Sequence, residues 1–371
     1  MVPGDKRHLG HEPPGASSTE LVVAAKKPRC DGALVSAPGG GGTLSVPGGS
    51  VPRTSDLAAP IMQLSGHAGE VLTARFSPCG AFLATAGFDK ELLLWQTFGD
   101  CRNYCTLRAH GKAVLQLAWG VDSTLLYSAG ADKTLVAWDA EYGERVARLT
   151  GHTSHVNSVA AARGARGMIA SGSDDCSCRV WDARVRSCVQ RVGTRFQTLA
   201  VELSADGGRL FAGGLDNVVR VFDLRRADNV ESAVIALAGH ADSITGLRLS
   251  PDGAHILSTA MDSTVRSWDV RPFVPAGADG SDGRGVRVYA GAVHNFEKNL
   301  IRCAWAPDGA RVASGSADRC VYVWDVPSSR MLYKLPGHKG SVNEVDFHPT
   351  QPIIASCSSD KTVYLGEIEA S

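Results

Sequence analysis

From residue 61 onward the sequence repeats itself, and this repeat limits the possible folds more than any other feature. Each unit opens with Gly-His or a related dipeptide. These are Gly66-His67, Ala109-His110, Gly151-His152, Gly193-Thr194, Gly239-His240, Val293-His294 and Gly337-His338. Most units are about 42–46 residues long, and a longer step separates His240 from His294. A repeat of this length is one supersecondary unit, which buries its apolar face only by packing against its neighbours.

A second signature closes each unit: an Asp stands six residues before a Trp-Asp-like dipeptide. The pairs are Asp89 and Trp95, Asp132 and Trp138, Asp175 and Trp181, Asp216 and Phe222, Asp262 and Trp268, Asp318 and Trp324, and Asp360 and Gly366. Period and signatures together resemble the WD-repeat β-propeller family, whose blades have four strands each. Seven units predict an all-β, seven-bladed propeller. Short apolar runs such as residues 92–95 fit strands, and helical periodicity is absent.

The resemblance implies a buried hydrogen-bonded tetrad of His, Ser or Thr, Asp and Trp in each blade. Five units keep all four residue types. They are His67, Thr85, Asp89 and Trp95; His110, Ser128, Asp132 and Trp138; His152, Ser171, Asp175 and Trp181; His240, Ser258, Asp262 and Trp268; and His294, Ser314, Asp318 and Trp324. Unit four replaces three members together with Thr194, Ala212 and Phe222, and unit seven lacks the Trp. Losing linked partners together avoids leaving one buried polar group unpaired.

The His, Ser and Asp of a tetrad superficially match a hydrolase triad, but a catalytic triad occurs once and this set occurs five times. The chain also has no P-loop, no nucleotide-binding glycine motif and no cluster at metal-ligand spacing. The sequence therefore predicts no catalytic, cofactor-binding or metal-binding residues. It predicts no enzyme.

The chain divides into a tail, residues 1–56, and a propeller, residues 57–371. The first 57 residues hold ten Gly and seven Pro, so we expect the tail to be disordered, and Lys26-Lys27-Pro28-Arg29 in it is a candidate nuclear import signal. Residues 61–64 precede the first Gly-His and have no earlier blade to complete. We expect them to pair with residues 363–368 and close the ring. The Gly-rich insertion at 276–285 is expected to be a flexible spacer, with no assigned role.

Several stretches carry a closer resemblance. They are residues 56–71, 86–95 with 98–104, 268–273 with 293–300, 333–338 and 364–368. They resemble the family of 40 kDa WD-repeat subunits of the U5 small nuclear ribonucleoprotein. The resemblance implies a nuclear, non-catalytic scaffold in pre-mRNA splicing, bound to the large central splicing scaffold protein of that particle. It implies a monomeric propeller within a complex, away from membranes, with RNA reached through the particle. A net charge of zero also fits a protein-contacting subunit better than a direct RNA reader.

The Gly-His loops and the repeated Asp are expected on one face of the ring, and residues beside them are candidates for partner binding. These candidates are Glu70, Leu72, Phe88, Leu115, His155, Asn157, Asp174, Gln197, Met261, Asn299 and Asn343. Phe88 and Met261 stand out, because exposed large apolar side chains are typical anchors of interfaces. Packing of both residues between blades is the competing interpretation.

One alternative function is a substrate receptor of a cullin-type ubiquitin ligase. Residues 181–184 and 268–271 have the WDxR pattern of such receptors, and Arg184 and Arg271 would contact the adaptor. A signalling scaffold like the β subunit of heterotrimeric G proteins is a further alternative. That subunit brings an N-terminal coiled coil, and residues 1–57 contain no heptads.

Overall fold

The computed structural model describes residues 53–226, 233–274, 284–295, 297 and 299–369. Residues 1–52 of the predicted tail, with the basic cluster at 26–29, lie outside the described residues, as do residue 275 and residues 276–283 of the Gly-rich insertion. The predictions made for those segments stay predictions.

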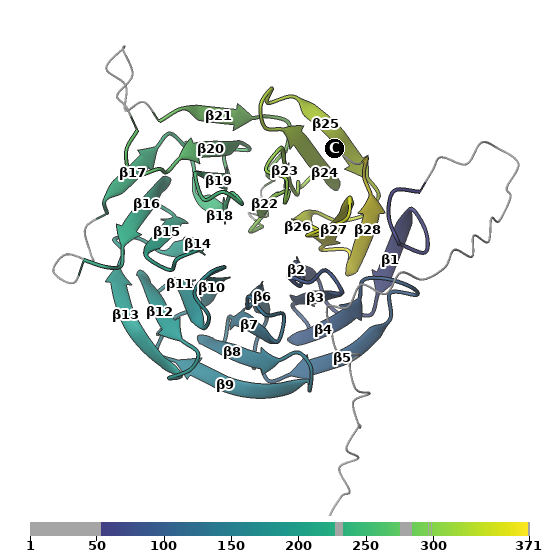
Figure 1. The fold of residues 1–371 in the computed structure, drawn as a ribbon, viewed down its shortest axis with the longest axis horizontal. Coiled ribbons are helices and arrows are strands. Elements are labelled where there is room, and N and C mark those ends of the chain that lie inside the picture. The colour runs from purple at the N-terminus through teal and green to yellow at the C-terminus, as the bar shows by residue number, and fades with distance from the viewer. Residues whose placement is uncertain (1–52, 227–232, 275–283, 296, 298, 370–371) are drawn as a thin grey trace, which may run out of the picture.

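The described chain forms seven four-stranded antiparallel sheets arranged as the blades of a ring (Figure 1). The innermost strand of each blade lies nearest the axis. These strands are β2 (Val71–Phe76), β6 (Val114–Trp119), β10 (Val156–Ala161), β14 (Thr198–Leu203), β18 (Ile244–Leu249), β22 (Cys303–Trp305) and β26 (Val342–Phe347). The predicted seven-bladed propeller is confirmed.

The other strands follow outward in the same order around the ring. The second strands are β3 (Phe82–Gly87), β7 (Leu125–Gly130), β11 (Met168–Ser173), β15 (Arg209–Gly214), β19 (His255–Ala260), β23 (Arg311–Ser314) and β27 (Ile353–Ser358). The third strands are β4 (Glu91–Gln96), β8 (Thr134–Asp139), β12 (Ser177–Asp182), β16 (Val218–Asp223), β20 (Val265–Asp269), β24 (Cys320–Asp325) and β28 (Thr362–Glu367). The outer strands are β5 (Asn103–Arg108), β9 (Glu144–Thr150), β13 (Ser187–Gly193), β17 (Ile235–Ala238), β21 (Val286–Tyr289), β25 (Met331–Pro336) and β1 (Ile61–Ser65).

The first strand of the chain completes the last blade. β1 pairs antiparallel with β28, from Ile61 opposite Gly366 to Ser65 opposite Thr362. In Figure 1 the purple N-terminal strand accordingly lies beside the yellow C-terminal ones. The predicted closure is confirmed. It leaves the third strand of blade seven without a free edge, which is how closed β architectures avoid unwanted pairing.

Residues 53–57 are attached to blade seven, although the sequence analysis assigned residues 53–56 to the tail. Arg53 donates hydrogen bonds to Glu367 from Nε at 3.0 Å and from Nη2 at 2.7 Å, and Ser55 Oγ donates to the same carboxylate. Leu57 is buried in the apolar cluster between blades seven and one. Residues 53–56 therefore make contacts with the propeller.

The apolar core is divided among the interfaces between blades. The cluster between blades one and two, for example, joins Leu92 and Leu94 of β4 with Val114 and Leu117 of β6. The Gly-His loops and the turns that carry the repeated Asp lie at one end of the blades, and we call this side the loop face. The innermost strands begin at the loop face and end at the opposite face.

Candidate functional site

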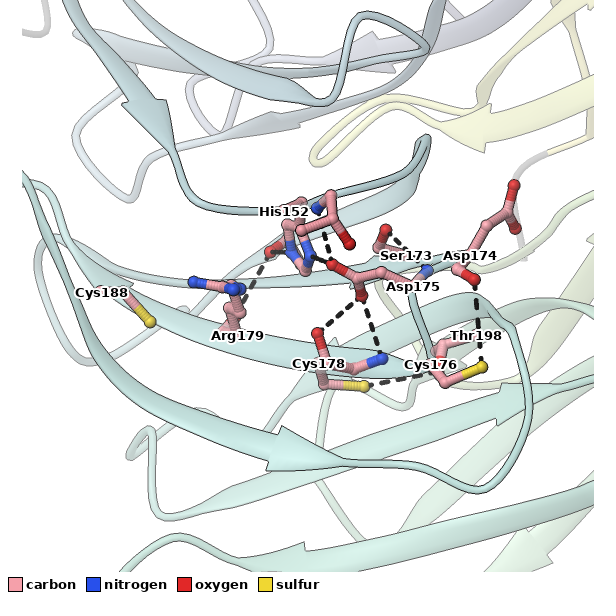
Figure 2. A network of polar contacts seen from close by, with 12 residues as sticks. His152, Ser173, Asp174, Asp175, Cys176, Cys178, Arg179, Cys188 and Thr198 are labelled. Atoms are coloured by element: carbon pink, nitrogen blue, oxygen red, sulfur yellow. Dashed lines mark hydrogen bonds and ion pairs between the residues drawn. The ribbon is translucent and has the colours of Figure 1, made fainter.

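A hydrogen-bonded tetrad lies beneath the loop face in blade three, and Figure 2 shows two of its members, His152 and Asp175. Trp181 Nε1–H donates to Ser171 Oγ at 2.8 Å, and His152 Nε2 lies 2.8 Å from the same oxygen. His152 Nδ1–H then donates to Asp175 Oδ2 at 2.8 Å. A neutral His with its proton on Nδ1 completes a chain in which each buried polar group has a partner.

Blades one, two and five repeat the chain with closely similar geometry. In each, the Trp indole donates to the Ser or Thr oxygen at 2.8 Å. The His Nδ1 to Asp distances range from 2.6 to 3.1 Å. The Asp also accepts a hydrogen bond from the backbone amide that follows the His, as in Ala68 and Ala241. These tetrads tie the loops of the loop face to the sheet beneath.

The charge states follow from burial and hydrogen bonding. Burial opposes ionisation of Asp175, but hydrogen bonds from Ser177, the Thr153 amide and His152 outweigh it and lower its pKa to about 2. Burial lowers the pKa of His152, although Asp175 acts in the opposite direction. The same balance lowers the pKa of His240 and His338. Neutral His beside ionised Asp is therefore the folded state near neutral pH.

These shifts predict that the fold is less stable in mild acid. The unfolded chain takes up protons on these His residues near pH 6.5, whereas the folded chain takes them up only at lower pH. The stabilisation from neutral His is thus complete above pH 6.5 and is lost progressively as the pH falls below that value. Thermal unfolding across this range should show a flat midpoint near pH 7 and a falling one below. A midpoint that rises or stays constant on acidification would contradict the assignment of neutral His.

Blade six departs from the predicted tetrad. Neither ring nitrogen of His294 has a hydrogen-bond partner within the described structure, and Trp324 Nε1 donates to Ala290 O at 3.1 Å. Ser314 Oγ donates to Gly315 O, while Asp318 accepts from Tyr322 Oη at 2.6 Å. The predicted set of His294, Ser314, Asp318 and Trp324 is therefore wrong as a connected network.

The register of the outer strand explains this difference. Tyr289 of β21 stands opposite Val265, as Leu107 of β5 stands opposite Leu92. Three residues after Leu107 comes the tetrad residue His110, but three residues after Tyr289 comes Ala292. His294 therefore lies beyond the tetrad position. Tyr322 bonds Asp318 and stacks on Trp324, with ring centroids 5.7 Å apart.

The two altered units compensate for their missing groups. In blade four, Asp216 pairs with Arg220, and Thr194 Oγ1 donates to Phe196 O at 2.9 Å. In blade seven, His338 still contacts Ser356 and Asp360, and the Tyr364 ring packs edge-on against His338 at 4.6 Å.

At the loop face, the backbone amide of the residue before each repeated Asp donates a hydrogen bond to the loop ahead of the innermost strand. Phe88 N donates to Glu70 O at 2.9 Å, and Leu215 N donates to Gln197 O at 3.2 Å. A Cβ on Gly87 would lie 1.9 Å from Glu70 O, so only glycine allows this approach. The result is a pair of apolar side chains held in solvent: Phe88 is 54% exposed and Leu215 is 44% exposed.

The remaining candidates of the sequence analysis divide by exposure. Gln197 is exposed, and the half-buried ones are Glu70, Leu72, Leu115, His155, Asp174, Met261 and Asn299. Asn157 and Asn343 are buried and serve as ties between blades: Asn157 Nδ2 donates to Thr198 O of blade four, and Asn343 Nδ2 donates to Val71 O of blade one. These two side chains are not available on the surface.

Four of these candidates occupy one structural position. Leu72, Leu115, Asn157 and Asn343 are the residues skipped by the ladder where each innermost strand bulges near its start. A bulge turns its extra side chain away from the normal alternation. Leu72 and Leu115 are thereby left half-buried at the loop-face end of the ring centre.

Sequence reasoning missed one exposed aromatic residue of the loop face. Phe196 is 49% exposed and lies in the loop of blade four that lacks the tetrad His. The available signal was the sequence Gly193-Thr194-Arg195-Phe196, in which a large apolar residue follows the altered Gly-His position. Phe196 and Leu215 give blade four an apolar surface of its own.

The comparisons with known proteins agree with this geometry. The family model described as "WD domain, G-beta repeat" matches residues 58–96, 101–139, 143–182, 232–269, 291–325 and 329–365. The U5 small nuclear ribonucleoprotein 40 kDa protein of Mus musculus is 50% identical over 355 residues, which cover 94% of this chain and 96% of the mouse protein. The chain belongs to this WD-repeat family.

Further relatives extend the family to distant organisms. The human U5 small nuclear ribonucleoprotein 40 kDa protein is 51% identical over 338 residues, covering 90% of this chain and 92% of that protein. Pre-mRNA-splicing factor cwf17 of Schizosaccharomyces pombe is 44% identical over 326 residues, covering 88% of this chain and 93% of its own. The family is non-catalytic. The WD-repeat model passes over blade four, the unit that has replaced three tetrad members.

The two WDxR arginines of this WD-repeat chain already have carboxylate partners. Arg184 contacts Asp182 through Nε at 3.0 Å and Nη2 at 2.7 Å, and Arg271 contacts Asp269 in the same way. Each Arg thus pairs with the Asp of its own Trp-Asp dipeptide, at the face opposite the loop face. A two-point contact between a planar guanidinium and a carboxylate holds the turn that carries both residues. The motif therefore has a local structural role.

Among the residues that the structure describes, no group of three or more His, Cys, Asp or Glu side chains could hold a metal ion. No helix in this part of the chain is long and apolar enough to cross a membrane.

Proposed function

We propose that this chain is a non-catalytic scaffold subunit of the U5 small nuclear ribonucleoprotein and acts in pre-mRNA splicing in the nucleus. The observation that carries the proposal is the similarity to U5 40 kDa proteins and to a pre-mRNA-splicing factor over almost the whole chain. In this role the monomeric propeller docks on the large central splicing scaffold protein, and its association with RNA is indirect.

The loop face is the surface we assign to this docking. It presents three exposed large apolar side chains, Phe88, Phe196 and Leu215, on a framework held by the tetrads. Exposed aromatic and aliphatic groups on rigid backbone are typical anchors of protein interfaces, because their burial on binding loses little conformational entropy. The candidates Glu70, His155, Asp174, Gln197, Met261 and Asn299 would surround these anchors as a polar and half-buried rim.

A double variant tests this surface. We expect Phe88→Asp with Leu215→Asp to reduce recovery of the central splicing scaffold protein by tenfold or more (about 1.4 kcal/mol per factor of ten), because two apolar anchors become charged. Tagged wild-type and variant proteins would be purified from nuclear extract and the recovered proteins quantified. Leu215 is preferred here to Met261, which is half-buried and whose replacement by Asp would disturb packing.

A matched control separates surface from fold. Tyr142→Asp changes an aromatic residue that is 64% exposed at the turn between β8 and β9, away from the loop face. We expect it to leave recovery unchanged. Equal recovery of the scaffold protein by the wild type and the double variant would reject the loop face as the docking surface.

A further inference from the structure

A cavity of about 370 Å³ opens at the centre of the ring on the face opposite the loop face. Its walls include the last residues of the innermost strands, among them Phe76, Trp119, Trp305 and Phe347, and prolines of the turns that follow. Figure 1 shows these strands surrounding the axis. Neither the tetrads nor the anchors of the loop face use this cavity.

One layer of side chains gives the cavity its chemistry. On each innermost strand, one residue lies opposite the tetrad Ser or Thr position of the second strand. The residue directly after it belongs to this layer, as Arg75 follows Ala74 opposite Thr85. Around the ring this layer is Arg75, Ala118, Ala160, Glu202, Arg248, Ala304 and Asp346. All but Ala304 line the cavity. The neighbouring alanines of blades two and three leave the space that the charged side chains border.

The charges of this layer are unevenly paired. Arg75 Nη2 lies 2.8 Å from Glu344 Oε1, and Asp346 Oδ2 accepts from the Phe76 amide at 3.0 Å. Arg248 is different, because its ion pairs to Glu202 Oε2 and Asp346 Oδ1 each span 3.8 Å. That separation exceeds the ~2.7–3.2 Å of an N–H···O hydrogen bond.

A third arginine extends the positive side of the cavity. Arg163 lines it, is exposed, and donates from Nη2 to Leu249 O at 3.3 Å. The cavity wall thus holds Arg75, Arg163 and Arg248 against the two carboxylates of Glu202 and Asp346. Arg302 and Glu344 are buried next to this layer. They add one positive and one negative charge, so the net charge is unchanged. One guanidinium charge in the cavity is therefore unmatched.

We propose that this cavity binds a carboxylate side chain of an acidic peptide segment from a protein partner, with Arg248 and Arg163 as its ligands. A guanidinium presents paired N–H donors that match a carboxylate in a two-point contact. The Trp and Pro walls take up the apolar residues on either side of the acidic one. The site lies on the opposite face from the loop face, so the propeller can hold two partner segments at once.

The surroundings favour a peptide over RNA. A single unmatched charge suits one carboxylate, whereas binding to a nucleic acid backbone needs several cations that together displace counterions. Glu202 and Asp346 in the wall would repel further phosphates. A cavity of about 370 Å³ also admits a few side chains of a peptide and no duplex.

The two tryptophans of the wall provide a direct readout. Trp119 Nε1 donates to Arg75 O and Trp305 Nε1 donates to Arg248 O, both at 3.0 Å. The full chain would be labelled with ¹⁵N at the Trp indoles, and its NMR spectrum recorded with two acetylated, amidated peptides, Pro-Leu-Glu-Pro and Pro-Leu-Gln-Pro. We expect the Glu peptide to shift the Trp119 and Trp305 signals and the Gln peptide to bind about tenfold more weakly.

Variants assign the effect to the arginines. Arg248→Gln should weaken binding of the Glu peptide about tenfold or more, and Arg163→Gln, at an exposed position, should also weaken it. Arg145→Gln, exposed on the outer strand of blade two, is the matched control and should bind normally. The indole signals of the other Trp residues, unchanged from the wild type, report that each variant is folded.

Three outcomes would overturn the proposal. Equal shifts with the Glu and Gln peptides would show that no carboxylate is recognised. A short oligouridylate that shifts the same two signals would show an RNA site. A change in these signals on deletion of residues 1–52, without added peptide, would show that the chain's own N-terminal segment occupies the cavity. Loss of U5 association in the whole protein would bear on the proposed function and leave this result intact.

Discussion

Deleting residues 58–65 should lower the thermal midpoint of unfolding by about 10 °C or more, or abolish the cooperative transition. This segment contains β1, whose residues 61–65 pair along β28. Its removal opens the ring, exposes the edge of blade seven and uncovers the cluster around Leu64 and Val363. Thermal unfolding followed by circular dichroism is the measurement.

Deleting residues 1–52 is the control, because it stops short of the Arg53 and Ser55 contacts to Glu367. We expect that midpoint to stay within about 2 °C of the wild type. Equal midpoints for the two deletions would contradict the closure of the ring by β1.

Ser258→Ala should lower the free energy of unfolding by about 2–4 kcal/mol, because it leaves two buried groups without a partner. Ser258 Oγ accepts a hydrogen bond from Trp268 Nε1 at 2.8 Å and lies 2.7 Å from His240 Nε2. Chemical denaturation gives this quantity directly. The size of the effect follows from the loss of a shared partner in a connected network.

Ser314→Ala is the matched control in blade six, since both Ser residues hold the same tetrad position in the sequence. Ser314 Oγ donates to the adjacent Gly315 O, and Trp324 bonds Ala290 O instead. We expect a loss of about 1 kcal/mol or less. A loss as large as that of Ser258→Ala would mean that blade six forms the tetrad after all.

The repeat made the architecture predictable because every unit has to bury its apolar faces against the next. The number of blades followed from counting units, and the four-stranded sheets followed from the family resemblance. The pairing of residues 61–64 with residues 363–368 followed from a segment that had no earlier blade to complete. The tetrads of blades one, two, three and five followed from the family resemblance, because regular strands keep its four residue types at their usual spacing.

The prediction of the tetrad in blade six was wrong because the loop before its His differs in length from the other loops. The sequence of blade six has all four residue types. However, the strand that precedes its His, β21 of blade five, is in a register that puts Ala292 at the tetrad position and His294 beyond it. A residue of the expected type at about the expected spacing need not occupy the expected position when the loop before it has changed length. The structure was needed to show that Tyr322 replaces the His contact with Asp318.

The candidate surface was predictable only in outline. Position beside the repeated Asp identified Phe88, which is exposed. Position shortly after the Gly-His dipeptide selected Asn157 and Asn343, which bond across to the next blade. Exposure at these positions depends on the neighbouring blade, and that contact is made through packing between units. The cavity opposite the loop face is likewise lined by residues from all seven units.

The most direct test of the central claim is to purify the tagged full chain from nuclear extract and sequence the small RNAs that accompany it. If the chain is a subunit of the U5 small nuclear ribonucleoprotein, U5 RNA should be enriched well above U1 and U2 RNA, together with the large central splicing scaffold protein. Recovery of the chain without small nuclear RNA, or with cullin adaptors in its place, would contradict the account.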